Sequence, residues 1–167
     1  EKMHIGCVGL VGKENDPLLL RVYKDSLAVD GLTNWTSEND EGILRYHYII
    51  YCSLDMVEER HKQPGQNVVP TTTKVSMYLG YLCPFEEFHV YGYVSNTHIK
   101  IIVAVEEQVG TGTAQPELQK FCKEVHQLYA NQLQNPFVAI GQRVTSQKFQ
   151  EELDKLVKGF NARNSSA

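Results

Sequence analysis

Residues 75–106 read VSMYLGYLCPFEEFHVYGYVSNTHIKIIVAVE, and this stretch contains three predicted strands in close succession. Turn-forming residues separate the strands at 84–87 and at 96–97, so 75–85, 88–95 and 98–106 are expected to form an antiparallel meander. In the last strand, Ile101 and Val103 point to one face of the sheet, while Ile102 and Ala104 point to the other. This pattern predicts a strand that is covered on both faces.

A second strand with apolar or small residues on both faces is predicted near the start of the chain, at residues 4–11. Dense turn formers follow at 12–17, and an apolar run at 18–23 completes a predicted hairpin. Because two strands are expected to be buried on both faces, the sheet needs helices on each of its sides.

Three amphipathic helices are available to cover the sheet. Pro116 opens the second helix and Asn135-Pro136 stops it. Ser146 is the predicted N-cap of the last helix, which is expected to end at Phe160 and to leave residues 161–167 as a disordered tail. The first helix, at 43–60, places five residues on one core-facing stripe: Ile43, His47, Ile50, Leu54 and Val57.

The predicted element order is β-β-α-β-β-β-α-α within a single domain at 3–160. The fold class is therefore α+β, with one helix on one face of a five-stranded, mainly antiparallel sheet and two helices on the other. This order is that of the longin, or SNARE-like, fold. Such a fold is shared by proteins of different activity and does not by itself fix the function.

The composition of the chain excludes several classes of function. The chain of 167 residues has a net charge of −4, and its 16 Lys and Arg are scattered among 20 Asp and Glu, which argues against nucleic-acid binding. The longest apolar runs, at 101–105 and 18–20, are far shorter than the roughly 20 residues that cross a membrane. Cysteines occur without C-x-x-C spacing and are expected to be reduced core residues: Cys7, Cys52, Cys83 and Cys122.

No catalytic, cofactor-binding or metal-binding residue is assigned from the sequence. The glycine-rich loop at 110–114 lacks the third glycine and the parallel βαβ unit of a dinucleotide site. His89 and His98 lie on adjacent predicted strands, but two ligands without a third more often form a strand pair than a metal site. The motifs of α/β-hydrolases and zinc proteases are absent from the sequence, so a non-catalytic protein is expected.

The outer face of the first helix is unusual because it is not polar. A helix that is apolar all round is buried on both sides, and the predicted fold leaves no further helix to cover this face. A partner protein is the simplest cover, since tyrosine is enriched at interfaces. The alternative is that the long loop at 24–42, with Trp35, folds over the helix. The predicted partner-binding residues are Leu44, Tyr48, Tyr51, Cys52 and Asp55.

The chain resembles the sedlin-like subunits of the TRAPP tethering complex over nearly the whole domain. Each short match is weak by itself, but together they occur in family order. The matching stretches are 13–15 (KEN) with 17–18 (PL), 45–48 (RYHY), 53–59 (SLDMVEE), 78–80 (YLG), 90–96 (VYGYVSN), 135–137 (NPF) and 141–144 (GQRV).

This resemblance implies a longin-type adaptor subunit that contacts other TRAPP subunits in ER-to-Golgi or intra-Golgi transport. It also implies an indirect role toward a Rab-family GTPase, peripheral membrane association through the complex, and a cytoplasmic, perinuclear place at Golgi and ER-Golgi membranes. Asp55 would be a sensitive contact position on the first helix. The family turn at Asn135, Pro136 and Phe137 is expected to be structural, with Phe137 tucked under the second helix.

Two loops, at 24–42 and 63–74, are longer than the family pattern leads us to expect, and either can alter the choice of partner. Two other functions remain open at this stage. One is a different longin-type binding module, such as a small clathrin-adaptor-like subunit. The other is a small-molecule-binding domain that uses the sheet as a cavity wall.

Overall fold

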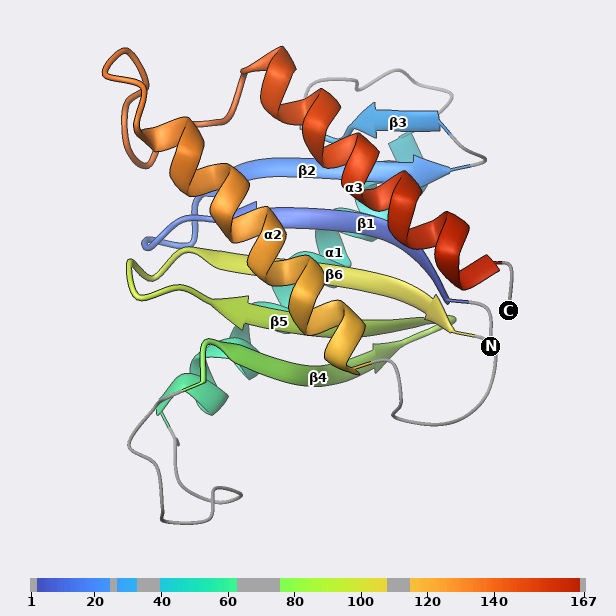
Figure 1. The fold of residues 1–167 in the computed structure, drawn as a ribbon. Coiled ribbons are helices and arrows are strands. Elements are labelled where there is room, and N and C mark those ends of the chain that lie inside the picture. Colours follow the sequence, from blue (N-terminus) through green and yellow to red (C-terminus); the bar gives the residue numbers. More distant parts are fainter. Residues whose placement is uncertain (1–2, 25–26, 33–39, 63–75, 108–114, 166–167) are drawn as a thin grey trace.

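The computed structural model describes residues 3–24, 27–32, 40–62, 76–107 and 115–165. Within these ranges one sheet contains β1 (Met3–Val11), β2 (Pro17–Lys24), β3 (Leu27–Asp30), β4 (Tyr78–Phe85), β5 (Phe88–Val94) and β6 (Lys100–Glu107). The helices are α1 (Asp40–Lys62), α2 (Gln115–Leu133) and α3 (Gln147–Ser165) (Figure 1). Trp35 and the loops at 63–74 and 110–114, which the sequence analysis singled out, lie outside the described residues.

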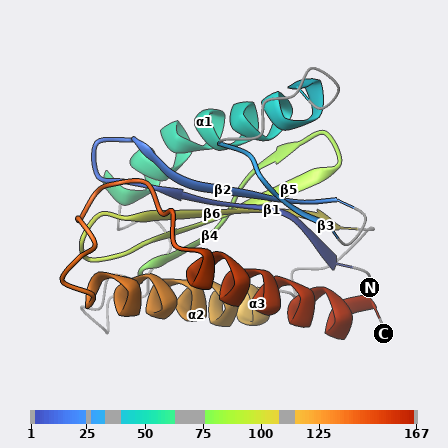
Figure 2. The same ribbon diagram turned by 90° about the horizontal axis from the view of Figure 1, so that it is seen from above.

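The strands lie side by side in the order β3-β2-β1-β6-β5-β4, and every neighbouring pair is antiparallel. Helix α1 covers one face, and α2 and α3 lie together on the other, which confirms the predicted layers (Figure 2). The prediction of five strands is wrong by one, because β3 pairs with β2 inside the predicted loop at 24–42. This four-residue strand has no fully buried side chain, so it gives no clear periodic pattern in the sequence.

Two hydrophobic cores separate the three layers, and the central strands contribute to both. Ile101 and Val103 pack toward α2 and α3, whereas Ile102 and Ala104 pack toward α1, as the alternation predicts. Helix α1 approaches β1 closely at Gly9, where an added Cβ would lie 2.6 Å from Cδ1 of Ile50. The burial of β1 and β6 on both faces is therefore confirmed and fixes the position of α1 over the sheet.

Helix α3 is longer than predicted. The Ser146 hydroxyl accepts a hydrogen bond from the Phe149 amide at 3.4 Å, in agreement with its role as N-cap. At the other end the helix runs to Ser165 instead of stopping at Phe160. The Asn161 side chain accepts a hydrogen bond from the Ile5 amide at 2.8 Å, so a tertiary contact supports the turn that was expected to be disordered.

Candidate partner-binding surface on helix α1

The outer face of α1 is open to solvent in the described part of the chain. The exposed fractions are 56% for Leu44, 60% for Tyr48 and 44% for Tyr51, and Cys52 and Asp55 are exposed as well. The opposite side of the helix buries Ile43, Ile50, Leu54 and Val57, as the helical spacing predicts, together with Ile49. We call the five exposed residues the α1 outer face; the structure brings all of them onto one side of one helix.

The predicted core position of His47 is only half-buried. Its Nε2 atom lies 2.8 Å from the carbonyl oxygen of Gly31, just after β3. Leu32 packs against the core between α1 and the sheet. The described start of the 24–42 loop therefore contacts the buried side of α1, and Trp35, which carried the alternative of a loop over the outer face, is outside the described residues.

The turn between β4 and β5 extends the α1 outer face, and sequence reasoning missed this contribution. The Tyr48 and Phe85 rings meet edge to face, with centroids 5.5 Å apart. The Arg45 guanidinium lies 5.3 Å from the centre of the Phe88 ring and forms ion pairs with Glu86 and Glu87. The surface therefore consists of an aromatic centre with a charged rim, which is the usual composition of a protein–protein interface.

The cysteines differ in their surroundings, and the expectation that all four are core residues is wrong for one of them. Burial raises the pKa of the Cys7 and Cys122 thiols to about 12. Partial burial is the main reason that the pKa of Cys83 is raised, and the charge of Cys52 adds to the effect. Cys52 is exposed, and its hydrogen bond with Tyr48, one helical turn away, raises the pKa of that phenol. Because the thiolate is the reactive form, these surroundings disfavour reaction at every cysteine except Cys52.

Brief treatment of the folded protein with N-ethylmaleimide is therefore expected to give a single fast adduct, at Cys52. The physical reason is that the other thiols combine burial with raised pKa values. Intact-mass analysis followed by peptide mapping measures the site, and the Cys52→Ser protein is the matched control that should lose the fast phase. A first adduct at Cys83 would contradict the exposure of the α1 outer face.

The turn at 135–137 is present, but Phe137 does not pack as predicted. The Asn135 side chain accepts a hydrogen bond from the Phe137 amide at 3.1 Å, and the Asn135 carbonyl accepts one from Val138 at 3.0 Å. This arrangement turns the Phe137 ring outward, where 93% of it is exposed. The expectation that Phe137 tucks under α2 is wrong, whereas the structural role of Asn135 and Pro136 stays a prediction.

Neither metal-binding nor membrane-spanning features emerge from the described ranges. Within them, His, Cys, Asp and Glu side chains form no group of three or more that fits a metal ion. The His98 ring contacts that of His61, and the His89 ring contacts that of Tyr81. In the same ranges, no helix has the length and apolar character needed to cross a bilayer.

An antiparallel sheet with one helix on one face and two on the other defines a longin-like protein. A family profile described as Sedlin matches residues 10–159, and the chain belongs to this family. It is 37% identical over 154 residues to the trafficking protein particle complex subunit 2-like protein of Dictyostelium discoideum, covering 92% of this chain and 96% of that protein. It is 31% identical to the protein of the same name in Rattus norvegicus, covering 86% and 89%, and 32% identical to the one in Bos taurus, with the same coverage.

Proposed function

We propose that this protein is a non-catalytic adaptor subunit of a TRAPP-type vesicle-tethering complex and that it binds other subunits through the α1 outer face. The observation that carries the proposal is the exposed set of Leu44, Tyr48 and Tyr51 on a helix whose other side is buried in the core. Exposed large apolar residues that gather on one face are typical of interaction sites. The names of the relatives supply the kind of complex.

The finer parts of the proposal rest on the family. The complex would act toward a Rab-family GTPase at ER-Golgi and Golgi membranes, and the chain would reach those membranes from the cytoplasm through its partner subunits, in the perinuclear region. The family match does not favour either alternative, a small clathrin-adaptor-like module or a small-molecule-binding domain.

Affinity purification of the tagged full chain from its native cells, followed by mass spectrometry at moderate salt, tests this function. Near-stoichiometric recovery of several subunits of the trafficking protein particle complex is the expected result. Recovery of the chain alone, or recovery of clathrin-adaptor subunits in their place, would contradict it. Fluorescence imaging of the tagged chain tests the location separately, and the expected signal is perinuclear and overlaps a Golgi marker.

Asp55→Arg is expected to weaken binding to the purified partner subunits by roughly 1–3 kcal/mol, because it reverses a charge at the edge of an aromatic interface. The thermal midpoint should hardly change, since Asp55 is exposed. Glu151→Arg is a matched control because it makes the same charge change at an exposed position of α3, on the other side of the sheet. If the Asp55→Arg protein binds with wild-type affinity, Asp55 is not part of the interface.

A further inference from the structure

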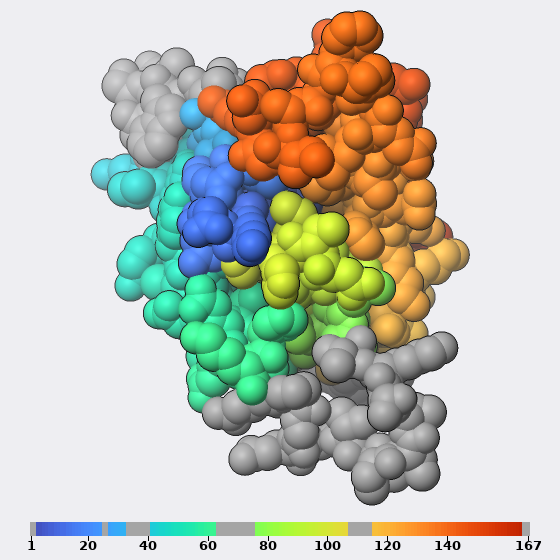
Figure 3. Space-filling view, turned by 90° about the vertical axis from the view of Figure 1, so that its left-hand side faces the viewer, coloured from blue at the N-terminus to red at the C-terminus, as the bar shows by residue number. Residues whose placement is uncertain are grey.

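A pocket of about 210 Å³ lies at one end of the molecule, where the last turns of α1 continue beyond Asp55 of the α1 outer face. The β1–β2 turn, the β5–β6 turn and the C-terminal end of α1 meet there, as Figure 3 shows from that end. The pocket is smaller than the roughly 300–1,000 Å³ of sites for drug-sized ligands, so it matches side chains rather than a large cofactor. Its lining residues are Lys13, Val57, Glu58, His61, Lys62, Val94, His98 and Lys100.

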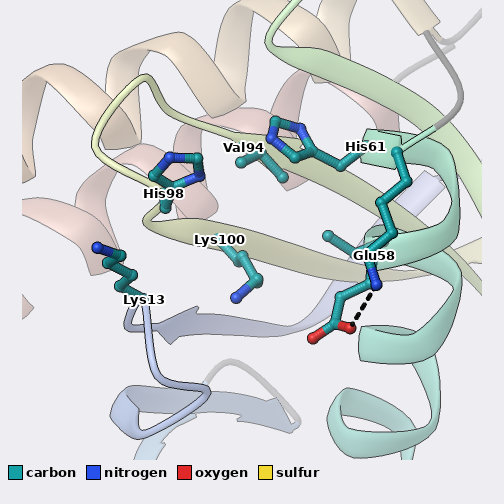
Figure 4. A pocket seen from close by; sticks show the side chains of 8 residues that line it. Lys13, Glu58, His61, Val94, His98 and Lys100 are labelled. Atoms are coloured by element: carbon teal, nitrogen blue, oxygen red, sulfur yellow. Dashed lines mark ion pairs between the residues drawn. The ribbon is translucent and has the colours of Figure 1, made fainter.

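The charged residues of the lining are mainly basic, although the whole chain has a net charge of −4. Three lysines and one carboxylate line the pocket, giving it a charge of +2 with both histidines neutral (three positive charges less one negative). In Figure 4, Lys13 and His98 lie on one side, Glu58 and His61 lie on the other, and Lys100 lies between them. The Glu58 carboxylate already accepts a hydrogen bond from Asn15 at 2.9 Å and pairs with Lys62 at 3.7 Å.

Lys100 is the residue that suggests an anionic ligand. It is only 7% exposed, which is rare for a lysine. The Asn15 hydrogen bond and the charges of Lys62 and Lys100 together lower the pKa of the Glu58 carboxylate in the same pocket. The Lys100 ammonium donates to Asn15 Oδ1 at 2.6 Å and to the Gly12 carbonyl at 3.4 Å, and both acceptors are neutral. No carboxylate in the described residues lies within ion-pair distance of it. An ammonium has three protons to donate, and these two acceptors use two of them.

The two turns that form the pocket hold their backbones in an uncommon conformation. Asn15 and His98 both have a φ of 62°, and neither is a glycine. Asn and His adopt this left-handed region more readily than most residues, and it is common in tight turns. Asn15 uses its side chain to bridge Lys100 and Glu58, so its turn is fastened to β6 and to α1. These hydrogen bonds link three of the elements that line the pocket.

We propose that this pocket binds an acidic peptide segment of a partner protein, in which an aliphatic side chain lies against Val57 and Val94 while neighbouring carboxylates meet Lys13, Lys62 and Lys100. The two valines contribute apolar surface to the lining, and the three lysines belong to the same lining. A lipid inositol-phosphate headgroup fits less well, because its hydroxyl-covered ring would leave polar groups unpaired against the valines. A leucine or similar side chain buried against the valines, with carboxylates paired to the lysines, satisfies both the apolar and the charged residues of the lining.

This site goes beyond the proposed function, because it uses the last turns of α1 with the β1–β2 and β5–β6 turns, and its chemistry differs from that of the aromatic α1 outer face. Each site can be tested with the other intact. If the pocket does not bind the peptide, the proposed adaptor role of the α1 outer face is unaffected. If the α1 outer face does not bind other subunits, the proposal for the pocket is unaffected.

Amide NMR spectra of the nitrogen-labelled full chain, titrated with the capped peptide EELLEE, test the site. The expected result is a set of saturable shifts at His98, Lys100 and the C-terminal turns of α1. The uncharged peptide QQLLQQ should bind at least about tenfold more weakly, because it lacks the carboxylates. Lys13→Glu/Lys62→Glu should weaken EELLEE binding by at least about tenfold, because both lysines line the pocket.

The control variant is Lys155→Glu/Lys158→Glu, which makes the same change in net charge at exposed positions of α3. It should keep the affinity for EELLEE within about twofold, since rim charges act over roughly 10 Å at ordinary salt. Absence of saturable shifts, equal binding of QQLLQQ, or equal loss in the α3 variant would overturn the proposal. Shifts at the same amides with phosphatidylinositol-phosphate vesicles but not with EELLEE would assign the pocket to a lipid headgroup and would also overturn it.

Discussion

Replacement of both tyrosines of the α1 outer face, Tyr48→Ala/Tyr51→Ala, is expected to abolish the recovery of tethering-complex subunits with the chain. Tyrosines at the centre of an interface are among the residues whose truncation costs most, and two together should weaken binding on the order of 100-fold or more. Both rings are exposed in the described structure, so little core packing is lost. The thermal midpoint is therefore expected to stay within about 3 °C of the wild type.

The matched control is Phe137→Ala/Ile140→Ala, which removes two other exposed apolar side chains, 93% and 79% exposed, from the loop between α2 and α3. This pair lies outside the α1 outer face and should leave subunit recovery unchanged. The measurement is quantitative mass spectrometry of purifications from cells that express each variant at equal level. If the loop variant loses the subunits while the tyrosine variant retains them, the partner surface is the loop and not α1.

The α1 outer face was predictable because a helix has a fixed period. At 100° per residue, Tyr48, Tyr51 and Asp55 must share a side opposite to Ile50 and Leu54, whatever the rest of the fold does. The part contributed by Phe85 was not predictable in the same way. Its contact with Tyr48 depends on β4 being the edge strand beneath α1, which is a property of strand order and not of local sequence.

The pocket at the end of α1 was even less predictable from the sequence than the contact of Phe85 with Tyr48. Its residues come from the β1–β2 turn, α1, β5 and the start of β6, and no two of these segments adjoin in the sequence except the last pair. Lys100 reads as the polar first residue of a strand, yet its side chain is buried against Asn15. Phe137 is the opposite case, because an aromatic residue after a helix stop predicts packing, while the Asn135 side chain turns it into solvent.

Asp154→Ala is expected to destabilise the protein by about 3 kcal/mol, because it leaves a nearly buried guanidinium without its partner. The side chains of Arg21 on β2 and Asp154 on α3 are only 10% and 16% exposed, and they form an ion pair through two guanidinium nitrogens. The Tyr23 hydroxyl donates a third hydrogen bond to the same carboxylate at 2.9 Å. Thermal unfolding should show a midpoint lowered by about 6–12 °C for a domain of this size.

Glu151→Ala on the same helix is the control, because it removes an exposed carboxylate and should cost less than about 0.5 kcal/mol. The double change Arg21→Met/Asp154→Leu replaces the pair with apolar side chains and is expected to recover most of the lost stability, since the unpaired charge is then removed. Equal midpoints for Asp154→Ala and Glu151→Ala would mean that water solvates Arg21 well enough to replace its partner. Recovery in the double variant would show instead that the pair contributes to stability mainly by satisfying Arg21, and that α3 is held on the sheet chiefly by its apolar face.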